Sequence, residues 1–460
     1  MSATLYLLAD EPEEAVSVRL ASPRTERALP PAYHAGGAWL AGLGIVLLAT
    51  LVSAAVLAIP SDPASDVLHY KYWTHQIATY GVSGSYSGTY PETAAIYPPV
   101  TMYGYRVVGW LYRHFYDLSF DMEAALQSQA LSVLVRLVAV VPHLATSLAI
   151  FGLLLRRFGA RPALLACAAF ALNPAAIFDA AYWGQPDMVH ALFLLIAIYC
   201  FEEDRPLVGY AFIGLAAATK PQAWALLPFL AYVSLRRFGL VKSLLGGAVA
   251  ALAGLATCIP YLVYGTFSEI FILPRLIAET MPVVTANAHN VWWLVTRGKP
   301  DFVFDSEPLI GPLAFLTYRQ GATLLTLLVM AYGIWRTDPH GRDGELSAMA
   351  AYIAFAWFMV TTRAHENHDM FVLPLLVMAT PRSRFAWAIF GLLSLTLLLN
   401  MALHDFGLEA LRASLLPPET WLRVQLANAA VNVGILVVWS VRLWQRGASA
   451  GVRRPASGAV

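Results

Sequence analysis

Residues 163–201 read ALLACAAFALNPAAIFDAAYWGQPDMVHALFLLIAIYCF, two apolar runs separated by the polar stretch YWGQPD at 182–187. An amide and an acid such as Gln185 and Asp187 are costly inside hydrocarbon, whereas polar groups and Trp183 are well placed at a membrane surface. The pattern therefore predicts two membrane helices that meet at one surface, with a polar turn there that a ligand can reach.

The whole chain has the composition of a polytopic membrane protein. Of its 460 residues, 58% are hydrophobic and only 13% are charged, and the mean hydropathy is +0.59. A soluble domain carries about 25% charged residues. The net charge is only +1, and the charged residues are not gathered into a basic face of the kind that binds nucleic acid. The three cysteines lie in or beside apolar runs, so we expect core residues rather than disulfides or metal ligands.

A membrane helix needs about 20 mostly apolar residues, which predicts an all-α protein with about 12 membrane helices, in a range of about 10 to 13. We expect a tail at 1–37, one membrane domain at 38–445 and a second tail at 446–460. The candidate spans are 38–59, 134–155, 162–180, 187–201, 206–219, 222–235, 243–264, 313–335, 346–362, 370–380, 385–403 and 424–441.

The distribution of arginine and lysine predicts the orientation, because cytoplasmic turns are enriched in both residues. With both tails in the cytoplasm, each short turn on that side is basic. The external side then holds the long connections 60–133 and 265–312. It also gathers five polar motifs, namely 61-SDPASD-66, YWGQPD, 219-TKPQ-222, 287-NAHN-290 and 363-RAHENHD-369.

The loop 60–133 is far longer than an ordinary connection and is expected to carry structure or function. The stretches 66–81 and 100–118 are aromatic and basic with apolar residues at helical spacing, which predicts two helices in the membrane interface. Asp66 begins the first of them, where it is placed to act as a general base on a hydroxyl. A role as the cap of that helix is an equally simple interpretation.

These motifs, in this order, resemble the GT-C superfamily of integral membrane glycosyltransferases over roughly residues 40–400. The resemblance is to bacterial members that use a sugar linked to polyprenyl phosphate, and to eukaryotic dolichol-phosphate-sugar mannosyl- and glucosyltransferases. Two departures stand out. Relatives often have two adjacent acids in the first loop, where Asp62 and Asp66 are separated here. The relatives often read His-Glu-Arg-Tyr where Asn367 and His368 stand here. The positive charge that this arginine supplies in the relatives must therefore come from another residue in this chain.

The resemblance implies a GT-C fold and transfer of a hexose, mannose-like, with inversion. The donor would be a polyprenyl-phosphate sugar and the acceptor a hydroxyl of a lipid, glycan or protein, on the periplasmic or external face of the cell's inner membrane. Asp66 would be the base, and no metal or other cofactor is expected. The donor phosphate would meet Lys220, Arg363, His365 and His289. Contacts to sugar or acceptor would come from Trp183, Gln185, Asp187, Tyr97, Gln222, Asn290 and Glu366, with Asp62 and Arg136 as secondary candidates.

Several of these residues also have a simpler interpretation. Lys220 can extend its charge to the interface, and Asp187 can cap the helix that follows Pro186. Arg136 either extends to the interface or meets the lipid phosphate, and the sequence does not choose between them. The spelling HENHD at 365–369 invites a metal site, but adjacent residues seldom converge on one ion unaided.

The rival function is that of a secondary transporter or lipid flippase, since about 12 spans is also a transporter count. Transporters tend to have repeated halves and polar sites near the middle of the membrane. The sequence has no evident repeat, and its acids gather outside the spans. We therefore expect membrane lipids and a lipid-linked sugar as partners, and no nucleic acid.

Overall fold

The computed structural model describes residues 32–60, 66–86, 95–273, 275, 279, 281–298 and 303–452. These residues form helices joined by turns, and the described part contains isolated β-bridges, such as Ala286 with His365, but no strand. The all-α prediction is therefore confirmed for the described residues.

Four of the described helices are long and apolar enough to cross a membrane: α1 (Ala32–Leu57), α5 (Gln129–Phe158), α19 (Arg384–His404) and α21 (Pro418–Val452). A fifth candidate is α6 (Ala160–Ala171) followed by α7 (Pro174–Ile177) and the π-helix η3 (Phe178–Trp183), which together form a bent pair with an angle of 47°. The length and composition of the described helices thus support a membrane protein, whereas the count of about 12 spans stays a prediction.

The remaining predicted spans coincide with shorter helices. A helix of about 12 residues is only about 18 Å long, against a hydrocarbon layer of about 30 Å, so the shortest of these elements cannot span that layer alone. The shorter helices are α8 (Asp187–Glu202), α9 (Pro206–Ala217), η4 (Pro221–Leu226), α10 (Leu227–Phe238), α11 (Leu240–Ala256), α16 (Tyr318–Trp335), α17 (Glu345–Val360) and α18 (Val372–Val377). Helices α8, α17 and α18 contribute to the buried core, whereas α11 and α16 keep large apolar side chains exposed.

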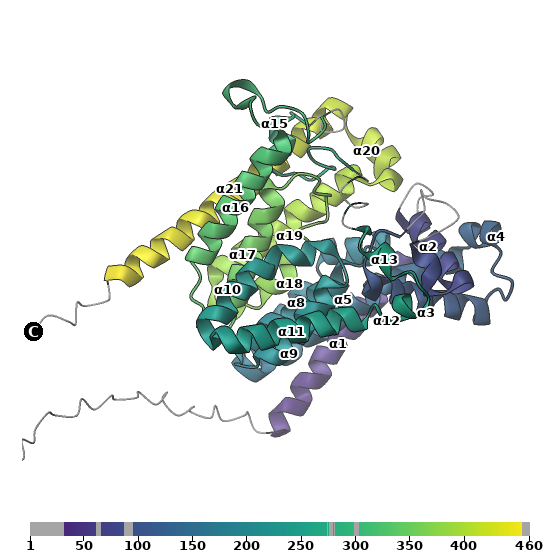
Figure 1. Ribbon diagram of the computed structural model, residues 1–460, viewed down its shortest axis with the longest axis horizontal. Helices are drawn as coiled ribbons and strands as arrows, with labels where there is room; N and C mark the ends of the chain where they lie inside the picture. Colours follow the sequence, from purple (N-terminus) through teal and green to yellow (C-terminus); the bar gives the residue numbers. More distant parts are fainter. Residues whose placement is uncertain are drawn as a thin grey trace, which may run out of the picture.

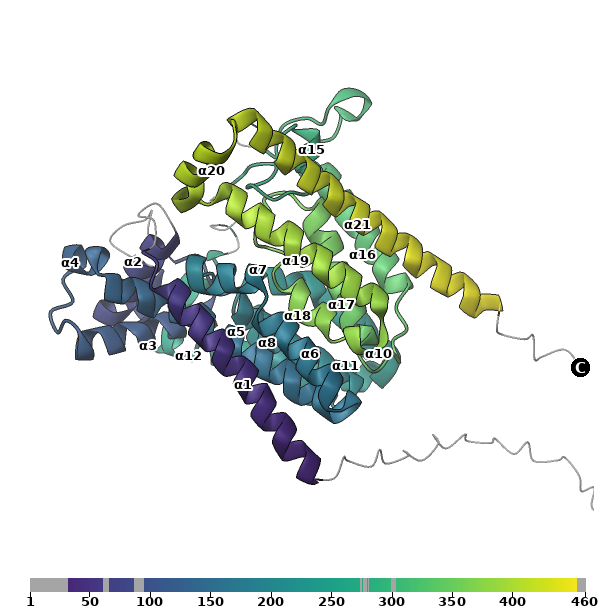
Figure 2. The ribbon, with the colours of Figure 1, turned by 180° about the vertical axis from the view of Figure 1, so that it is seen from behind.

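The main core lies between α5, α6, α8, α17, α18 and α19, where side chains such as Phe170, Leu194 and Phe355 are fully buried. Large apolar side chains are also exposed, among them Leu47 on α1 and Leu252 on α11. An outer surface of this kind is suited to lipid. Figures 1 and 2 show that α1 begins, and α21 ends, at the same end of the bundle.

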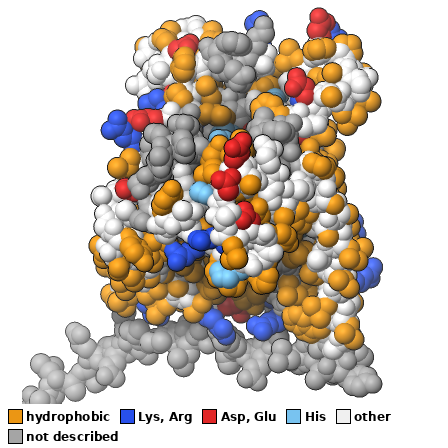
Figure 3. Space-filling model, turned by 90° about the vertical axis from the view of Figure 1, so that its right-hand side faces the viewer, with side chains coloured by type: hydrophobic (Ala, Val, Ile, Leu, Met, Phe, Trp, Pro, Cys, Tyr) orange, Lys and Arg blue, Asp and Glu red, His pale blue; other side chains and the backbone are white. Residues whose placement is uncertain are grey.

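The first loop contributes α2 (Asp66–Tyr80), α3 (Pro99–Phe115) and α4 (Met122–Gln127), which project from the opposite end of the bundle (Figure 1). Two helices thus form where the sequence predicts them. They share a second, aromatic core, in which the rings of Tyr70 and Tyr105 stack at 5.3 Å. Figure 3 views this side of the molecule, where acidic, basic and histidine side chains gather between hydrophobic ones. Shorter elements at this end are α12 (Ile259–Val263), α13 (Phe267–Ile270), α15 (Val291–Val295) and α20 (Glu409–Leu415).

Candidate functional site

A cavity of about 360 Å³ brings together segments that lie far apart in the sequence. Its walls come from the start of α2, the turns before α3, α8 and η4, and the loop between α17 and α18. The lining residues are Asp66, Ile96, Tyr97, Gln185, Lys220, Pro221, Gln222, Met281, Trp357, Thr361, Thr362, Arg363, Ala364, His365, Asn367 and His368. Four of the five polar motifs of the sequence thus contribute to one cavity.

Gln185 connects the acid of the cavity to its buried lysine. Its Nε2 donates to Oδ2 of Asp66 at 2.5 Å, and its Oε1 accepts from Nζ of Lys220 at 3.5 Å. The hydroxyl of Tyr97 donates to the same Oε1 at 3.2 Å. One amide therefore fixes a carboxylate, an ammonium group and a phenol around the cavity.

The local fold of YWGQPD explains how Gln185 reaches this position. Gly184 has φ 82°, and the backbone N–H groups of Gly184 and Gln185 both donate to the carbonyl oxygen of Asp179, which ends η3. A Cβ at position 184 would lie 2.6 Å from Cγ of Arg136, so both the backbone angle and the space require glycine. The turn exposes Gln185 to the cavity immediately before α8 begins.

Lys220 is a buried cation held by a buried acid. Pro221 favours an extended residue before it, and Lys220 has φ −153° and ψ 141°. Its Nζ lies 2.7 Å from Oδ1 of Asp187, and Nδ2 of Asn367 donates to Oδ2 of Asp187 at 2.7 Å. An ammonium group has three donors, and these contacts with Asp187 and Gln185 engage two of them.

The predicted capping role of Asp187 is wrong. Helix α8 begins at Asp187 itself, after Pro186, and has no side-chain cap. The carboxylate is instead the counter-ion of Lys220, and it lies outside the cavity lining. Contact between Asp187 and a sugar stays a prediction.

Arg363 reaches the cavity from the loop after α17, with φ 62° in the left-handed region. Its Nε donates to Oδ2 of Asp305 at 2.6 Å, and Arg319 binds the same carboxylate. Burial alone would raise the pKa of Asp305, but the two guanidinium groups outweigh this and lower it. Two arginines thus share one acid beside the cavity.

The cavity also contains side chains suited to hydroxyl groups. Oε1 of Gln222 is buried and receives no hydrogen bond from the described residues. Tyr97 and Trp357 present aromatic faces of the kind that pack on sugars. His365 and His368 both line the wall, with ring centroids 5.0 Å apart.

The sequence did not predict five of the lining residues, namely Asn367, His368, Thr361, Thr362 and Trp357. The first two lie inside the motif 363–369, whereas no sequence signal marks the other three.

Six of the predicted site residues that the structure describes lie outside the cavity lining, among them Asp187 and Arg136. His289 is buried and meets His404 at 3.0 Å and Asn428 at 2.8 Å. Asn290 caps α15. Trp183 packs against the main core. Glu366 is buried, with its Oε2 3.6 Å from Nδ1 of His365.

Asp66 is the first residue of α2, and its carboxylate accepts a hydrogen bond from Gln185. Burial raises the pKa of Asp66; Glu366 adds to this effect, and His365, His69 and Lys220 oppose it. Asp62, the alternative base, lies outside the described residues. The described residues contain no group of three or more His, Cys, Asp or Glu side chains placed to hold a metal.

Arg136 is fully buried in α5 and faces backbone carbonyl groups. Its guanidinium donates to the carbonyl oxygens of Leu57 at 2.7 Å, Ala181 at 3.1 Å and Ser132 at 3.0 Å. It therefore joins the ends of α1 and η3 and does not line the cavity. Its full burial does not fit the interfacial interpretation, and the phosphate-binding interpretation stays a prediction.

Replacing Arg136 with glutamine is therefore expected to destabilise the protein without changing the lining of the cavity. Each buried carbonyl group that loses its donor costs about 1–3 kcal/mol. The measurement is the midpoint of thermal unfolding in detergent. A lower midpoint supports the structural role, whereas an unchanged midpoint would show that these three carbonyl contacts do not stabilise the protein.

An apolar groove of about 430 Å³ is lined by residues that follow those of the polar cavity in the sequence. Pro98 and Pro99 line it directly after Tyr97 of the cavity, and Trp224 lines it two residues after Gln222. The rest of the wall comes from α9, α11 and α13, including Ile213, Leu255 and Phe271. A polar cavity together with an apolar groove suits a ligand with a polar head and a long apolar chain.

Comparison with models of protein families finds no match, and comparison with curated proteins finds no relative. Among solved structures, the crystal structure of ArnT from Cupriavidus metallidurans bound to undecaprenyl phosphate is similar. The identity is 16%, the TM-score is 0.47, and the match covers 87% of this chain and 76% of ArnT. A likeness this distant carries no argument about activity.

Proposed function

We propose that this protein is an integral membrane glycosyltransferase of the GT-C type, which transfers a sugar from a polyprenyl-phosphate donor to an acceptor hydroxyl. The observation that carries the proposal is the cavity in which Asp66 and Lys220 are joined by Gln185, together with the apolar groove. A base, a cation and a place for a lipid chain are the three elements that this reaction requires.

In the proposed reaction, Asp66 accepts the proton of the acceptor hydroxyl while the oxygen of that hydroxyl attacks the anomeric carbon of the donor sugar. The bond between that carbon and the phosphate oxygen breaks, and polyprenyl phosphate leaves with the bonding electron pair. Attack from the side opposite the leaving group inverts the anomeric centre. Lys220, Arg363 and His365 line the cavity and would stabilise the negative charge on the phosphate.

The donor chain is proposed to lie in the apolar groove, with the phosphate near Lys220 and the sugar against Tyr97, Gln222 and Trp357. We propose a hexose, mannose-like, as the sugar, transferred without a metal on the external face of the inner membrane. The acceptor is a lipid, glycan or protein hydroxyl that enters from the side of Asp66.

The test is transfer from a panel of radiolabelled polyprenyl-phosphate sugars by the full-length protein in vesicles, with membrane extract as acceptor. We expect the radiolabel to move from one of the donors into the membrane extract, and that donor identifies the sugar. A transporter or flippase would instead move an intact labelled solute or lipid across the vesicle membrane with no new glycoside. Movement without transfer would therefore overturn the proposal.

A further inference from the structure

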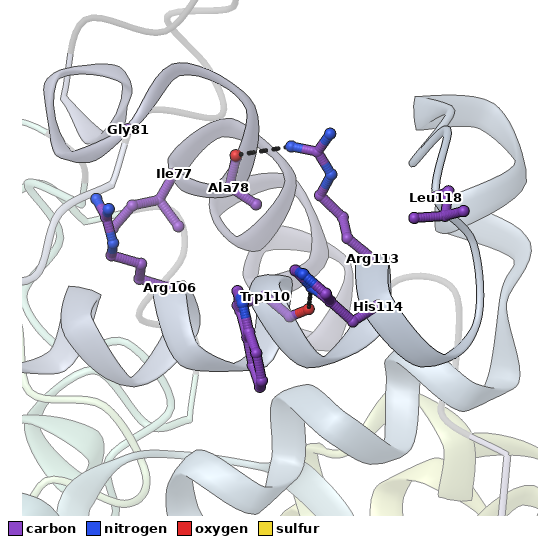
Figure 4. Close-up of a pocket in the computed structure, with 8 residues that line it drawn as sticks. All are labelled: Ile77, Ala78, Gly81, Arg106, Trp110, Arg113, His114 and Leu118. Carbon is purple, nitrogen blue, oxygen red and sulfur yellow. Dashed lines mark hydrogen bonds between the residues drawn. The ribbon is translucent and has the colours of Figure 1, made fainter.

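A second pocket, of about 370 Å³, lies in the first loop between α2 and α3, away from the candidate site. Its lining is Ile77, Ala78, Gly81, Arg106, Trp110, Arg113, His114 and Leu118, shown in Figure 4. Asp66 stands at the other end of α2, and the 11 residues to Ile77 correspond to about 16 Å of helix. The two sites are therefore separate.

One face of α3 supplies the chemistry of this pocket. Arg106, Trp110, Arg113 and His114 follow the spacing i, i+4, i+7 and i+8, which places them on the same side of a helix. Figure 4 shows the guanidinium groups of Arg106 and Arg113 on either side of Ala78, with Trp110 between them and His114 beside Trp110. The rings of Trp110 and His114 lie 4.6 Å apart.

The lining has two permanent cations and no acid. Within the described part of the chain, neither Arg106 nor Arg113 forms an ion pair with a carboxylate. Arg113 donates one N–H to the carbonyl oxygen of Ala78 at a long 3.4 Å, and Nδ1 of His114 donates to Trp110 O at 2.8 Å. Among the described residues, the other guanidinium donors of Arg106 and Arg113 have no hydrogen-bond acceptor. Guanidinium groups match the paired oxygens of a phosphate group.

The surroundings identify the source of that phosphate. Beside the pocket, large apolar side chains are exposed, among them Val107 at 58%, Phe115 at 71% and Leu118 at 78%. Trp110 itself is 53% exposed. Arginine beside exposed aromatic and apolar side chains is the composition of a helix in the membrane interface, where lipid headgroups lie. An apolar rim would bring no advantage to a site for inorganic phosphate.

We infer that the pocket between α2 and α3 binds the phosphate headgroup of an anionic membrane lipid. Arg106 and Arg113 hold the phosphate, Trp110 packs against the headgroup, and the apolar rim contacts the upper part of the acyl chains. The bound lipid fastens the α2–α3 pair to the membrane surface, at the end of α2 remote from Asp66.

The test is native mass spectrometry of the full-length protein released from an uncharged detergent. The probes are phosphatidylglycerol, phosphatidylcholine with the same acyl chains, and inorganic phosphate. We expect phosphatidylglycerol to bind at least about tenfold more tightly than phosphatidylcholine. The double variant R106Q/R113Q should lose this preference, and R106Q alone should lose part of it.

The matched control is R297Q/R423Q, which removes two exposed arginines outside this lining. It should keep the preference for phosphatidylglycerol, and circular dichroism should show the same helical content in all variants. An unchanged preference in R106Q/R113Q would overturn the inference, as would an equal loss in the control. Displacement of the lipid by millimolar inorganic phosphate would overturn the assignment to a lipid headgroup.

Discussion

Asp66→Asn is expected to lower the rate of sugar transfer by about 10²–10⁴-fold while donor binding is kept. The amide retains the shape of the side chain and can still meet Gln185, which holds the carboxylate at 2.5 Å. It cannot accept the proton of an acceptor hydroxyl. The measurements are initial rates with saturating donor and, separately, the dissociation constant of the donor.

The matched control is Asp121→Asn, because Asp121 belongs to the same loop and caps α4, a role that asparagine performs equally well. It should leave the rate unchanged. A pH profile gives an independent readout. Burial raises the pKa of Asp66, so the rate of the wild type should rise with pH through a value above about 3.9, the usual pKa of aspartate. Equal rates for wild type and Asp66→Asn would exclude Asp66 as base and direct attention to Asp62.

Lys220→Met is expected to remove both stability and activity. Its Nζ lies 2.7 Å from Asp187, and both side chains are almost fully buried. Removing one partner of a buried pair leaves an uncompensated charge and costs about 3–5 kcal/mol. The midpoint of thermal unfolding should fall accordingly, whereas Lys242→Met, on an exposed lysine of α11, should leave it unchanged.

A double variant separates the two effects of Lys220. Lys220→Met combined with Asp187→Asn leaves a neutral pair, and the new amide can still accept from Asn367. Most of the lost stability should return. Transfer should stay about 10²–10³-fold below the wild type, because the departing phosphate still lacks its cation. Restored transfer in the double variant would show that Lys220 only balances the charge of Asp187.

The helices were predictable because apolar runs of sufficient length leave few alternatives. Each predicted span coincides with a helix, and the polar motifs contribute to one cavity because they fall between spans on one side. Four motifs lie in its wall, whereas NAHN at 287–290 does not, since His289 and Asn290 bond to other parts of the bundle. The position of a polar motif between two predicted spans therefore predicts at which end of the bundle the motif lies, but not whether it lines a cavity there.

The charge partners were not predictable, since they depend on contacts between distant segments. Asp187 follows a proline and stands at the start of a helix, which favours a capping role. In the structure it instead forms an ion pair with Lys220, which lies between α9 and η4. Arg363 is paired with Asp305 across two loops. Arg136 binds carbonyl oxygens, which every residue has and no motif marks. Rules based on neighbouring residues in the sequence therefore fail for a side chain whose partner is a distant charged residue or the end of another helix.

The aromatic core shared by α2 and α3 has a consequence for the order of assembly. Apart from Tyr261 and Leu273, its buried members fall between Val67 and Val138, so most of its contacts are local in sequence. Local contacts form quickly, and chains emerge from the ribosome N-terminus first. We therefore expect this pair to fold early in biosynthesis, as a preformed platform that carries Asp66. The site itself is completed only when the segments of Lys220 and Arg363 have been inserted.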